Sequence, residues 1–455
     1  DISGAEFYDT ILDIAPSPLD ANAIWVGTDD GLIQRTADGG AHWSNVTPPF
    51  VAPWGRVPAV EPSRVSAGRA YAVVDRHVMG DRHPYILATE DGGASWTSIV
   101  RGLPADQPAR VVREDPVNAN VLYAGLEQGV WYSLDRGAHW RSFRFEMPPT
   151  SVHDLRIAPR ERDLVAGTHG RGVYIFDDLT PIEGLAAAEN GRAPVLFAPL
   201  PATTWYYWWK SQYGTWDTGC CSPTGTFAAF DPPYGAAISY YLPRPLPKNP
   251  ILEVRDARGA LVRRIEGTND SGINRIAWNL TSEPPEPWHD TGEWNQGPSD
   301  GAPVVPGKYT LQLHAGSTPL EQALDVLPDP RAAWTQSDYV ARAAFLTELN
   351  NELSSMDVAL NRLDRLRLHA RGAMLREATL ARDAFTSGVR NPEDDQLMPD
   401  QVRERLTILA GTVALSQGPP LPPHYREAQA VRADYERAMN RYRHFIEDYH
   451  IPVTP

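Results

Sequence analysis

Three stretches of the chain share one pattern: Thr36-Ala-Asp-Gly-Gly-Ala-His-Trp43, Thr89-Glu-Asp-Gly-Gly-Ala-Ser-Trp96 and Ser133-Leu-Asp-Arg-Gly-Ala-His-Trp140. Each begins with Ser or Thr, has Asp at the third position and Gly at the fifth, and ends in Trp. The aspartates lie 53 and then 44 residues apart. A repeat of about 40–50 residues is the length of one four-stranded blade of a β-propeller. The spacing therefore predicts propeller blades.

Each position shared by the three repeats has a local structural role. The aspartate carboxylate can accept hydrogen bonds from backbone N–H groups of a tight turn. The glycine takes a left-handed backbone conformation at no steric cost. The tryptophan starts the next strand and is expected to pack its large ring between blades. We therefore interpret six residues as structural: Asp38, Trp43, Asp91, Trp96, Asp135 and Trp140.

The sequence around these turns repeats as well. Ala23-Ile-Trp-Val-Gly27 parallels both Val121-Leu-Tyr-Ala-Gly125 and Asp163-Leu-Val-Ala-Gly167. Four blade-like units result, and the last of them lacks the glycine and tryptophan of the pattern, as terminal repeats often do. Their bounds are about 6–48, 54–100, 108–146 and 149–178.

The repeats resemble the Asp-box, or BNR, repeats of sialidases, sortilin-type receptors, xyloglucanase-like glycosidases and a photosystem assembly factor. The chain is similar to the C-terminal part of large secreted bacterial Asp-box propeller proteins, which often carry the label glycosyl hydrolase. This resemblance implies a fold and no chemistry, because the repeat occurs in enzymes and in binding proteins. Similar propellers have more than four blades, so we expect the others on a missing N-terminal segment or a partner chain.

The remaining chain changes character twice. We predict propeller blades over residues 1–179, a Trp/Tyr-rich wrapping linker over 180–235, and short strands over 236–330. Those strands resemble an immunoglobulin-like β-sandwich. Apolar residues then recur at helical spacing over 336–450, which predicts a helical bundle or hairpin. The fold class is mainly β: a partial propeller, an immunoglobulin-like sandwich and a C-terminal helical bundle.

Composition excludes several classes of partner. The 455 residues carry 42 Lys+Arg against 57 Asp+Glu, a formal net charge of -15, which argues against a nucleic-acid-binding face. No apolar run approaches the roughly 20 residues needed to span a bilayer. No motif for a metal or a nucleotide occurs, and no cofactor is expected. The two cysteines, Cys220 and Cys221, are adjacent and are either free thiols or a strained ring.

Candidate ligand residues lie in the turns between the second and third strands of the expected blades. In a propeller these turns face the central funnel, whereas the Asp-containing turns point away from it. If the chain has a funnel site, eight residues are candidates: Asp29, Asp30, Asp75, Arg76, His77, Glu127, His169 and Arg171. The alternative is that they are polar hairpin turns that use glycine for positive φ.

A second candidate is the aromatic cluster of the linker, whose rings could stack on sugars or grip a partner. It consists of Trp205, Trp208, Trp209 and Trp216. The alternative is that these rings pack the linker against its own neighbouring domains.

Three functions remain open at this stage. The first is a binding or scaffold protein, secreted, periplasmic or on the cell surface, that presents its domains to a protein or glycan partner. The second is a secreted glycoside hydrolase, or part of one, which would need two carboxyl groups facing one cavity about 5–10 Å apart. The third is a sortilin-like peptide-binding receptor. The absence of a nucleophile motif favours the first.

Overall fold

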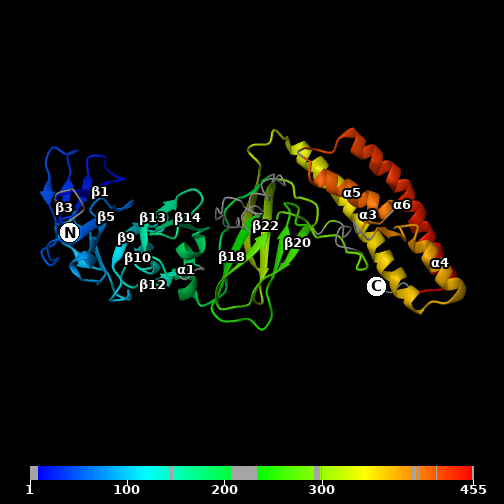
Figure 1. Cartoon of the computed structure of the whole chain (residues 1–455), viewed down its shortest axis with the longest axis horizontal. Coiled ribbons are helices and arrows are strands. Elements are labelled where there is room, and N and C mark those ends of the chain that lie inside the picture. Colours follow the sequence, from blue (N-terminus) through cyan, green and yellow to red (C-terminus); the bar gives the residue numbers. More distant parts are fainter. Residues whose placement is uncertain are drawn as a thin grey trace. The chain divides into compact units, whose positions relative to one another are not determined.

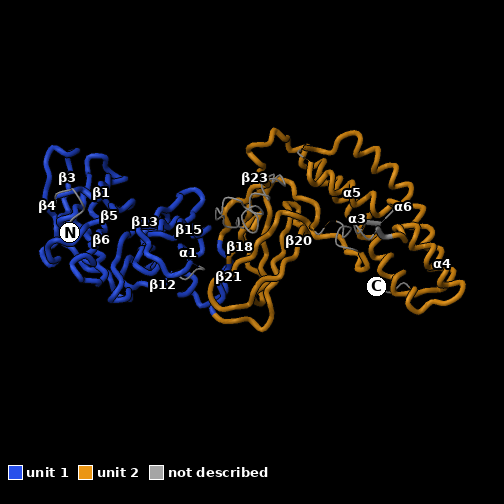
Figure 2. The backbone as a smooth tube through the Cα atoms, in the orientation of Figure 1, with its two compact units in different colours: residues 1–197, 240–243 blue, residues 198–239, 244–455 orange. Residues whose placement is uncertain are grey.

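The computed structural model describes residues 9–143, 147–205, 233–291, 298, 300–391, 396–397, 399–416 and 418–452. Two compact units make up the chain, residues 1–197 with 240–243 and residues 198–239 with 244–455 (Figure 2). The predictions for Trp208, Trp209, Trp216, Cys220 and Cys221 fall outside the described residues.

The first unit consists of four antiparallel sheets in succession, with the strands of each sheet in chain order (Figure 1). Sheet one holds β1 (Ile11–Pro16), β2 (Ile24–Thr28), β3 (Ile33–Thr36) and β4 (Ser44–Asn45). Sheet two holds β5 (Arg56–Pro62), β6 (Ala70–Asp75), β7 (Tyr85–Thr89) and β8 (Thr97–Ser98). Sheet three holds β9 (Ala109–Glu114), β10 (Leu122–Leu126), β11 (Gly129–Ser133) and β12 (Arg141–Phe143). Sheet four holds β13 (Val152–Ala158), β14 (Asp163–Thr168) and β15 (Val173–Phe176).

In sheets two and three, an inner strand is buried on both faces. Every residue of β6 and of β10 is buried, as expected for strands covered by a neighbouring sheet on each side. The first strands of successive sheets pack on one another. Phe143 of sheet three meets Phe176 of sheet four at 5.4 Å between ring centroids. The prediction that this region is mainly β is therefore confirmed, with several antiparallel sheets packed in succession.

The three repeated turns have one hydrogen-bond pattern. In the first, Thr36 Oγ1 donates to Asp38 Oδ1 at 2.8 Å, and the same carboxylate oxygen accepts from the His42 N–H at 2.9 Å. Gly40 has φ +96°, which a side chain would strain, and its N–H donates to Thr36 Oγ1 at 3.0 Å. The turns at Asp91 and Asp135 repeat these bonds within 0.2 Å.

The tryptophans of these turns do not all have the same contacts. The Trp96 indole donates to the backbone oxygen of Val46 at 2.8 Å, and Trp140 donates to that of Ile99 at 2.5 Å. Both indoles therefore contact the preceding sheet. Trp43 is instead 45% exposed and donates to the oxygen of Gly40 in its own turn. Trp43 has no such contact in the described residues, because no described sheet precedes sheet one.

The variant Asp91→Asn should lose a pH-dependent part of the stability of the first unit. Hydrogen bonds from the Ser95 side chain, the Ser95 N–H and Thr89 lower the pKa of Asp91 from 3.8 to about 2. Because the pKa is lower in the folded state, ionised Asp91 stabilises the fold above about pH 4, and this contribution is lost as the pH falls towards about 2. Urea unfolding of both proteins from about pH 6 to about pH 2 measures the effect.

The stability difference between wild type and Asp91→Asn should therefore shrink as the pH falls. The control is Asp106→Asn, at an exposed position. A difference that stays constant over this range would contradict the assigned role of the carboxylate.

The segment predicted as a linker opens with a helix, α1 (Thr180–Gly191), which belongs to the first unit. Arg162 pairs with Glu183 of this helix. Two further sheets follow. A three-stranded sheet has the order β16 (Val195–Leu196), β18 (Ala236–Leu242), β21 (Gly272–Trp278). A five-stranded sheet has the order β17 (Ala202–Thr204), β23 (Leu320–Pro328), β22 (Gly307–His314), β19 (Ile251–Arg255), β20 (Leu261–Glu266). The immunoglobulin-like topology stays a prediction.

The C-terminal region is helical, as the apolar periodicity predicts. Its helices are α3 (Gln336–His369), α4 (Gly372–Arg382), α5 (Val402–Ala414) and α6 (Pro422–Asp448), with a short hairpin of β24 (Arg390–Asn391) and β25 (Gln396–Leu397). A capping box of Thr335 and Asp338 starts α3. The sequence did not indicate α4, which buries only Ala378, Ala381 and Arg382.

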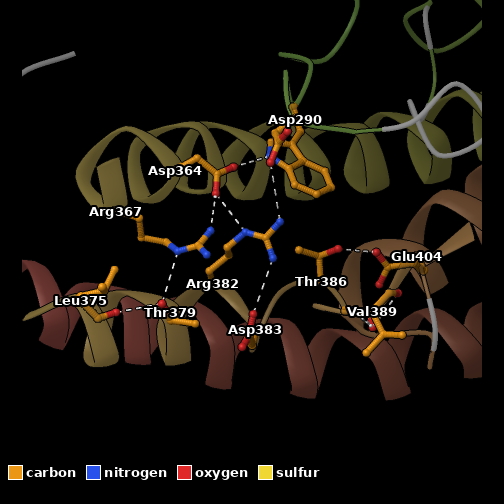
Figure 3. A network of polar contacts seen from close by, with 12 residues as sticks. Asp290, Asp364, Arg367, Leu375, Thr379, Arg382, Asp383, Thr386, Val389 and Glu404 are labelled. Carbon is orange, nitrogen blue, oxygen red and sulfur yellow. Dashed lines mark hydrogen bonds and ion pairs between the residues drawn. The ribbon is translucent and has the colours of Figure 1, made fainter. Parts of the chain in front are cut away.

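A tryptophan from outside the helices completes this helical core. Trp288 follows β21 and is buried among the core side chains of the helices. Its Nε1 donates to Asp364 Oδ2 at 2.8 Å. The guanidinium groups of Arg382 and Arg403 lie 5.3 and 5.1 Å from its ring centroid. Figure 3 shows Asp364 placed between Arg367 and Arg382, with which it also pairs.

One ion pair of the bundle is buried. Arg403 of α5 has no exposed surface, and Asp357 of α3 is also buried. Arg403 donates Nε to Asp357 Oδ1 at 2.7 Å and an amino group to Asp357 Oδ2 at 3.1 Å, a bidentate pair. Burial raises the pKa of Asp357, and the hydrogen bond from Arg403 opposes this rise.

Candidate functional site

Four of the eight candidate turn residues lie in one polar cluster on sheets two, three and four. We call this set the polar turn cluster; it comprises Asp75, His77, Arg110, Glu127, Ser151, His153 and His169. The second-to-third-strand turn of each sheet lies at the same end as the start of its first strand, since the strands alternate in direction. This alternation brings residues from both kinds of position together.

A buried carboxylate anchors the cluster. Asp75 ends β6 and is buried. It accepts the His77 N–H at 3.0 Å, and His77 Nδ1 lies 2.8 Å from both carboxylate oxygens. This contact orients the imidazole and directs its Nε2 away from Asp75.

Arg110 connects this carboxylate to the next sheet. Its two terminal amino groups pair with different carboxylates, one with Asp75 and the other with Glu127 Oε2 at 2.7 Å. The arginine side chain is largely buried. One guanidinium therefore pairs with two carboxylates on neighbouring sheets, which joins sheets two and three electrostatically.

Glu127 stays ionised in this arrangement. Burial opposes its ionisation, but the hydrogen bond and charge of Arg110 outweigh that effect and lower the pKa of Glu127. Ser151 Oγ also donates to Glu127 Oε2, at 3.1 Å. Because the Ser151 hydroxyl is bound to Glu127, it is not paired with His77 as a nucleophile-base dyad would require.

Two exposed histidines complete the cluster on sheet four. The rings of His153 and His169 stack with 5.0 Å between centroids and 28° between planes. The His169 N–H donates to the Ser151 backbone oxygen at 2.9 Å, which fixes the turn that carries it. Partial burial, with the nearby charges of Arg110 and His169, lowers the pKa of His153. The His153 ring is therefore uncharged at neutral pH.

Sequence reasoning missed Arg110, Ser151 and His153. All three lie in or just before the first strand of a sheet, and only turn residues were considered. An arginine within the apolar run of β9 was the available signal, because a charge that is buried in a strand needs a partner. The partners themselves lie 35 and 17 residues away along the chain.

The other four candidates do not join the cluster. Asp29 accepts the Thr10 N–H at 2.9 Å, and Asp30 accepts the Thr28 hydroxyl, so both contacts stay within sheet one. Arg76 binds the loop before β5, donating to the Ala52 and Pro53 oxygens at 2.6 and 2.7 Å. Arg171 is exposed in the turn after β14.

Of the aromatic candidates only Trp205 is described. It lies in the second unit with the guanidinium of Arg331 5.0 Å from its ring centroid. It lines a cavity of about 390 Å³ together with Trp334, Tyr339 and Asp300. The Trp334 ring in turn carries the guanidinium of Arg342 at 5.2 Å. The stacking of sugars on Trp205 stays a prediction.

Two further searches covered only the described part of the chain. In it, no group of three or more His, Cys, Asp or Glu residues has the geometry to hold a metal ion. Likewise, none of the helices in the ranges given above combines the length and the apolar content needed to cross a bilayer.

Comparison with known proteins gives structural neighbours at low identity. No family model and no curated protein sequence matches the chain. A solved structure of YCF48 bound to D1 peptide is 19% identical over 37% of this chain and 51% of its own, with a TM-score of 0.30. YCF48 from Cyanidioschyzon merolae is 16% identical over 37% of this chain and 56% of its own, at 0.25. The GH74 enzyme of Niastella koreensis is 12% identical over 69% of this chain and 47% of its own, at 0.31. This chain thus spans about half the length of each of these proteins.

Proposed function

We propose that this chain is an extracytoplasmic binding or scaffold protein, part of a larger propeller protein or complex, whose polar turn cluster contacts a protein or glycan partner. The observation that carries this proposal is the double pairing of Arg110 with Asp75 and Glu127 on neighbouring sheets. The exposed His153 and His169 rings border this charged core and offer flat surfaces with hydrogen-bonding nitrogens.

The same pairing weighs against glycoside hydrolysis by these residues. A glycosidase needs one carboxyl group that stays protonated near neutral pH, so its pKa must be raised. Arg110 lowers the pKa of Glu127 and pairs with Asp75 as well. Glu127 therefore lacks the environment of a general acid. The extracytoplasmic location and the sortilin-like alternative rest on the resemblance of the repeats alone.

The double variant His153→Ala/His169→Ala should abolish binding of the partner while the fold is retained. Both side chains are exposed, so removing them should change the free energy of unfolding by less than about 0.5 kcal/mol. The partner would be identified in one of two ways. Native mass spectrometry of the protein purified from its source would detect a bound chain, and a screen of soluble polysaccharides would detect a glycan. Titration calorimetry then compares wild type, the double variant and the matched control Arg171→Ala.

The competing function is tested with Glu127→Gln. A binding protein should hydrolyse no member of the polysaccharide panel in either form. Hydrolysis by the wild type that disappears in Glu127→Gln would overturn the proposal and establish the glycosidase instead. Unchanged affinity of the histidine double variant would show that the partner does not use the polar turn cluster.

A further inference from the structure

In sheets two, three and four, one face points toward the preceding sheet. At one equivalent position on this face, sheet one differs from the other three. Ile14 pairs with Val26, Val60 with Ala72, Val112 with Ala124 and Leu155 with Ala166, each on the first strand of its sheet. Their exposed fractions are 60, 2, 0 and 0% in that order. The three buried residues are covered because each has a preceding sheet. Ile14 carries the same kind of side chain without such a cover.

The repeated turn of sheet one also lacks a contact that the turns of sheets two and three make. A Cβ placed on Gly93 would lie 2.7 Å from Val46 Cβ, and one on Gly137 would lie 2.5 Å from Ile99 Cδ1. These two glycines therefore receive the β-branched residue that follows the fourth strand of the preceding sheet. Among the described residues, a Cβ placed on the equivalent Gly40 would meet only the indole of Trp43 within 4 Å, at 3.8 Å.

We propose that this face, formed by Ile14, Gly40 and Trp43, is the docking surface for a further four-stranded propeller blade, additional to the sheets of the described residues. The contacts between sheets one and two and between sheets two and three indicate which features the docking blade needs. Its fourth strand is followed by Val or Ile, whose side chain packs on Gly40. The backbone oxygen of that residue accepts the Trp43 indole N–H, as Val46 and Ile99 do for Trp96 and Trp140.

A second copy of the chain would not supply this contact with its last sheet. Sheet four has three strands in the described residues, so the position that follows a fourth strand is missing from it there. The proposal specifies how the chain joins the larger propeller protein or complex of the function proposed above, and it rests on that part of the function. Its tests involve no residue of the polar turn cluster, so the two can fail separately.

The first test compares matched variants in the full chain. Ile14→Asp should leave the Tm of the first unit unchanged, because the side chain already meets solvent. Val60→Asp and Val112→Asp, at the equivalent covered positions, should lower it by roughly 10 °C or more, because they bury an unpaired charge. If Ile14→Asp lowers the Tm as much as Val60→Asp, the face is already covered within the chain and the proposal is wrong. A dimer of the wild-type chain that Ile14→Asp dissociates would also overturn it, in favour of a second copy.

The second test supplies a blade. Residues 48–99, which contain sheet two and end at Ile99, are placed directly before Asp1 of the full chain. Ten residues then separate the added Ile99 from Ile11, where nine separate the native Ile99 from Ala109. The readout is oxidation of Trp43 by N-bromosuccinimide, followed by peptide mass spectrometry, with the buried Trp140 as internal reference.

In the unmodified chain Trp43 should react fast, and in the fusion it should slow to the rate of Trp140. The matched control carries Ile99→Asp in the added copy only and should restore fast oxidation of Trp43. Equal rates in the chain and in the folded fusion would overturn the proposal. Should the fusion not fold, the comparison of Ile14→Asp with Val60→Asp still decides the matter.

Discussion

Replacing Asp357 with alanine should lower the free energy of unfolding of the second unit by about 3–5 kcal/mol. The variant leaves Arg403 with its full charge and without the bidentate carboxylate that now accepts its Nε and amino hydrogens. The guanidinium has no exposed surface, so water cannot replace the lost acceptor unless the helices separate. Urea unfolding followed by far-ultraviolet circular dichroism measures the loss.

A second ion pair on the same helix provides the control. Glu348 pairs with Arg432 at 2.8 Å, but its side chain is more than half exposed. Glu348→Ala should therefore cost less than about 1 kcal/mol. The double variant Asp357→Leu/Arg403→Met removes both buried charges and should recover most of the stability that Asp357→Ala loses. If Glu348→Ala and Asp357→Ala cost the same, burial is not what makes the Asp357–Arg403 pair strong.

Trp288→Ala should be similarly destabilising, by about 3–5 kcal/mol, because it removes the largest side chain that the helical core receives from outside the helices. It also removes a hydrogen bond to Asp364 and the aromatic face next to two arginines. Thermal unfolding of the second unit would report the change.

The conservative variant Trp288→Phe separates these effects. It keeps most of the apolar volume and loses the indole N–H, so about 1 kcal/mol is expected. Asp364 keeps its pairs with Arg367 and Arg382 in that variant (Figure 3). Trp43→Ala, which truncates an exposed tryptophan, should stay within about 0.5 kcal/mol of wild type. A loss in Trp288→Phe as large as in Trp288→Ala would place the stabilisation in the N–H group alone.

The repeated turns were predictable because all their hydrogen bonds are local. Thr36, Asp38 and His42 lie within six residues of one another, so the sequence pattern by itself predicts the geometry of the turn. The exposure of Trp43 was not predictable in the same way. Its surroundings depend on whether another sheet precedes it, and the pattern of sheet one is the same in either case.

The candidate site was predictable only in part, for the same physical reason. Turn residues such as Asp75 and Glu127 stand out in the sequence as polar residues between apolar strands. Their partner Arg110 does not, because the pairing depends on how two sheets face each other. Likewise Trp288 lies between a strand and a helix, where no periodicity connects it with the core it enters.

The segment that carries Trp288 is hydrogen-bonded to α3 at several points. Ser354 accepts the Glu286 N–H at 3.0 Å, and the Asn361 amide binds both the Pro287 oxygen and the His289 N–H. These α3 residues share one helix face, because they are separated by whole turns.

A boundary drawn by secondary structure alone, just before α3, would thus separate the helices from part of their own interior. In a fragment starting at residue 336, the surface of α3 that residues 286–289 cover would be exposed. For this half of the protein, the smallest piece able to fold by itself begins well upstream of its first helix.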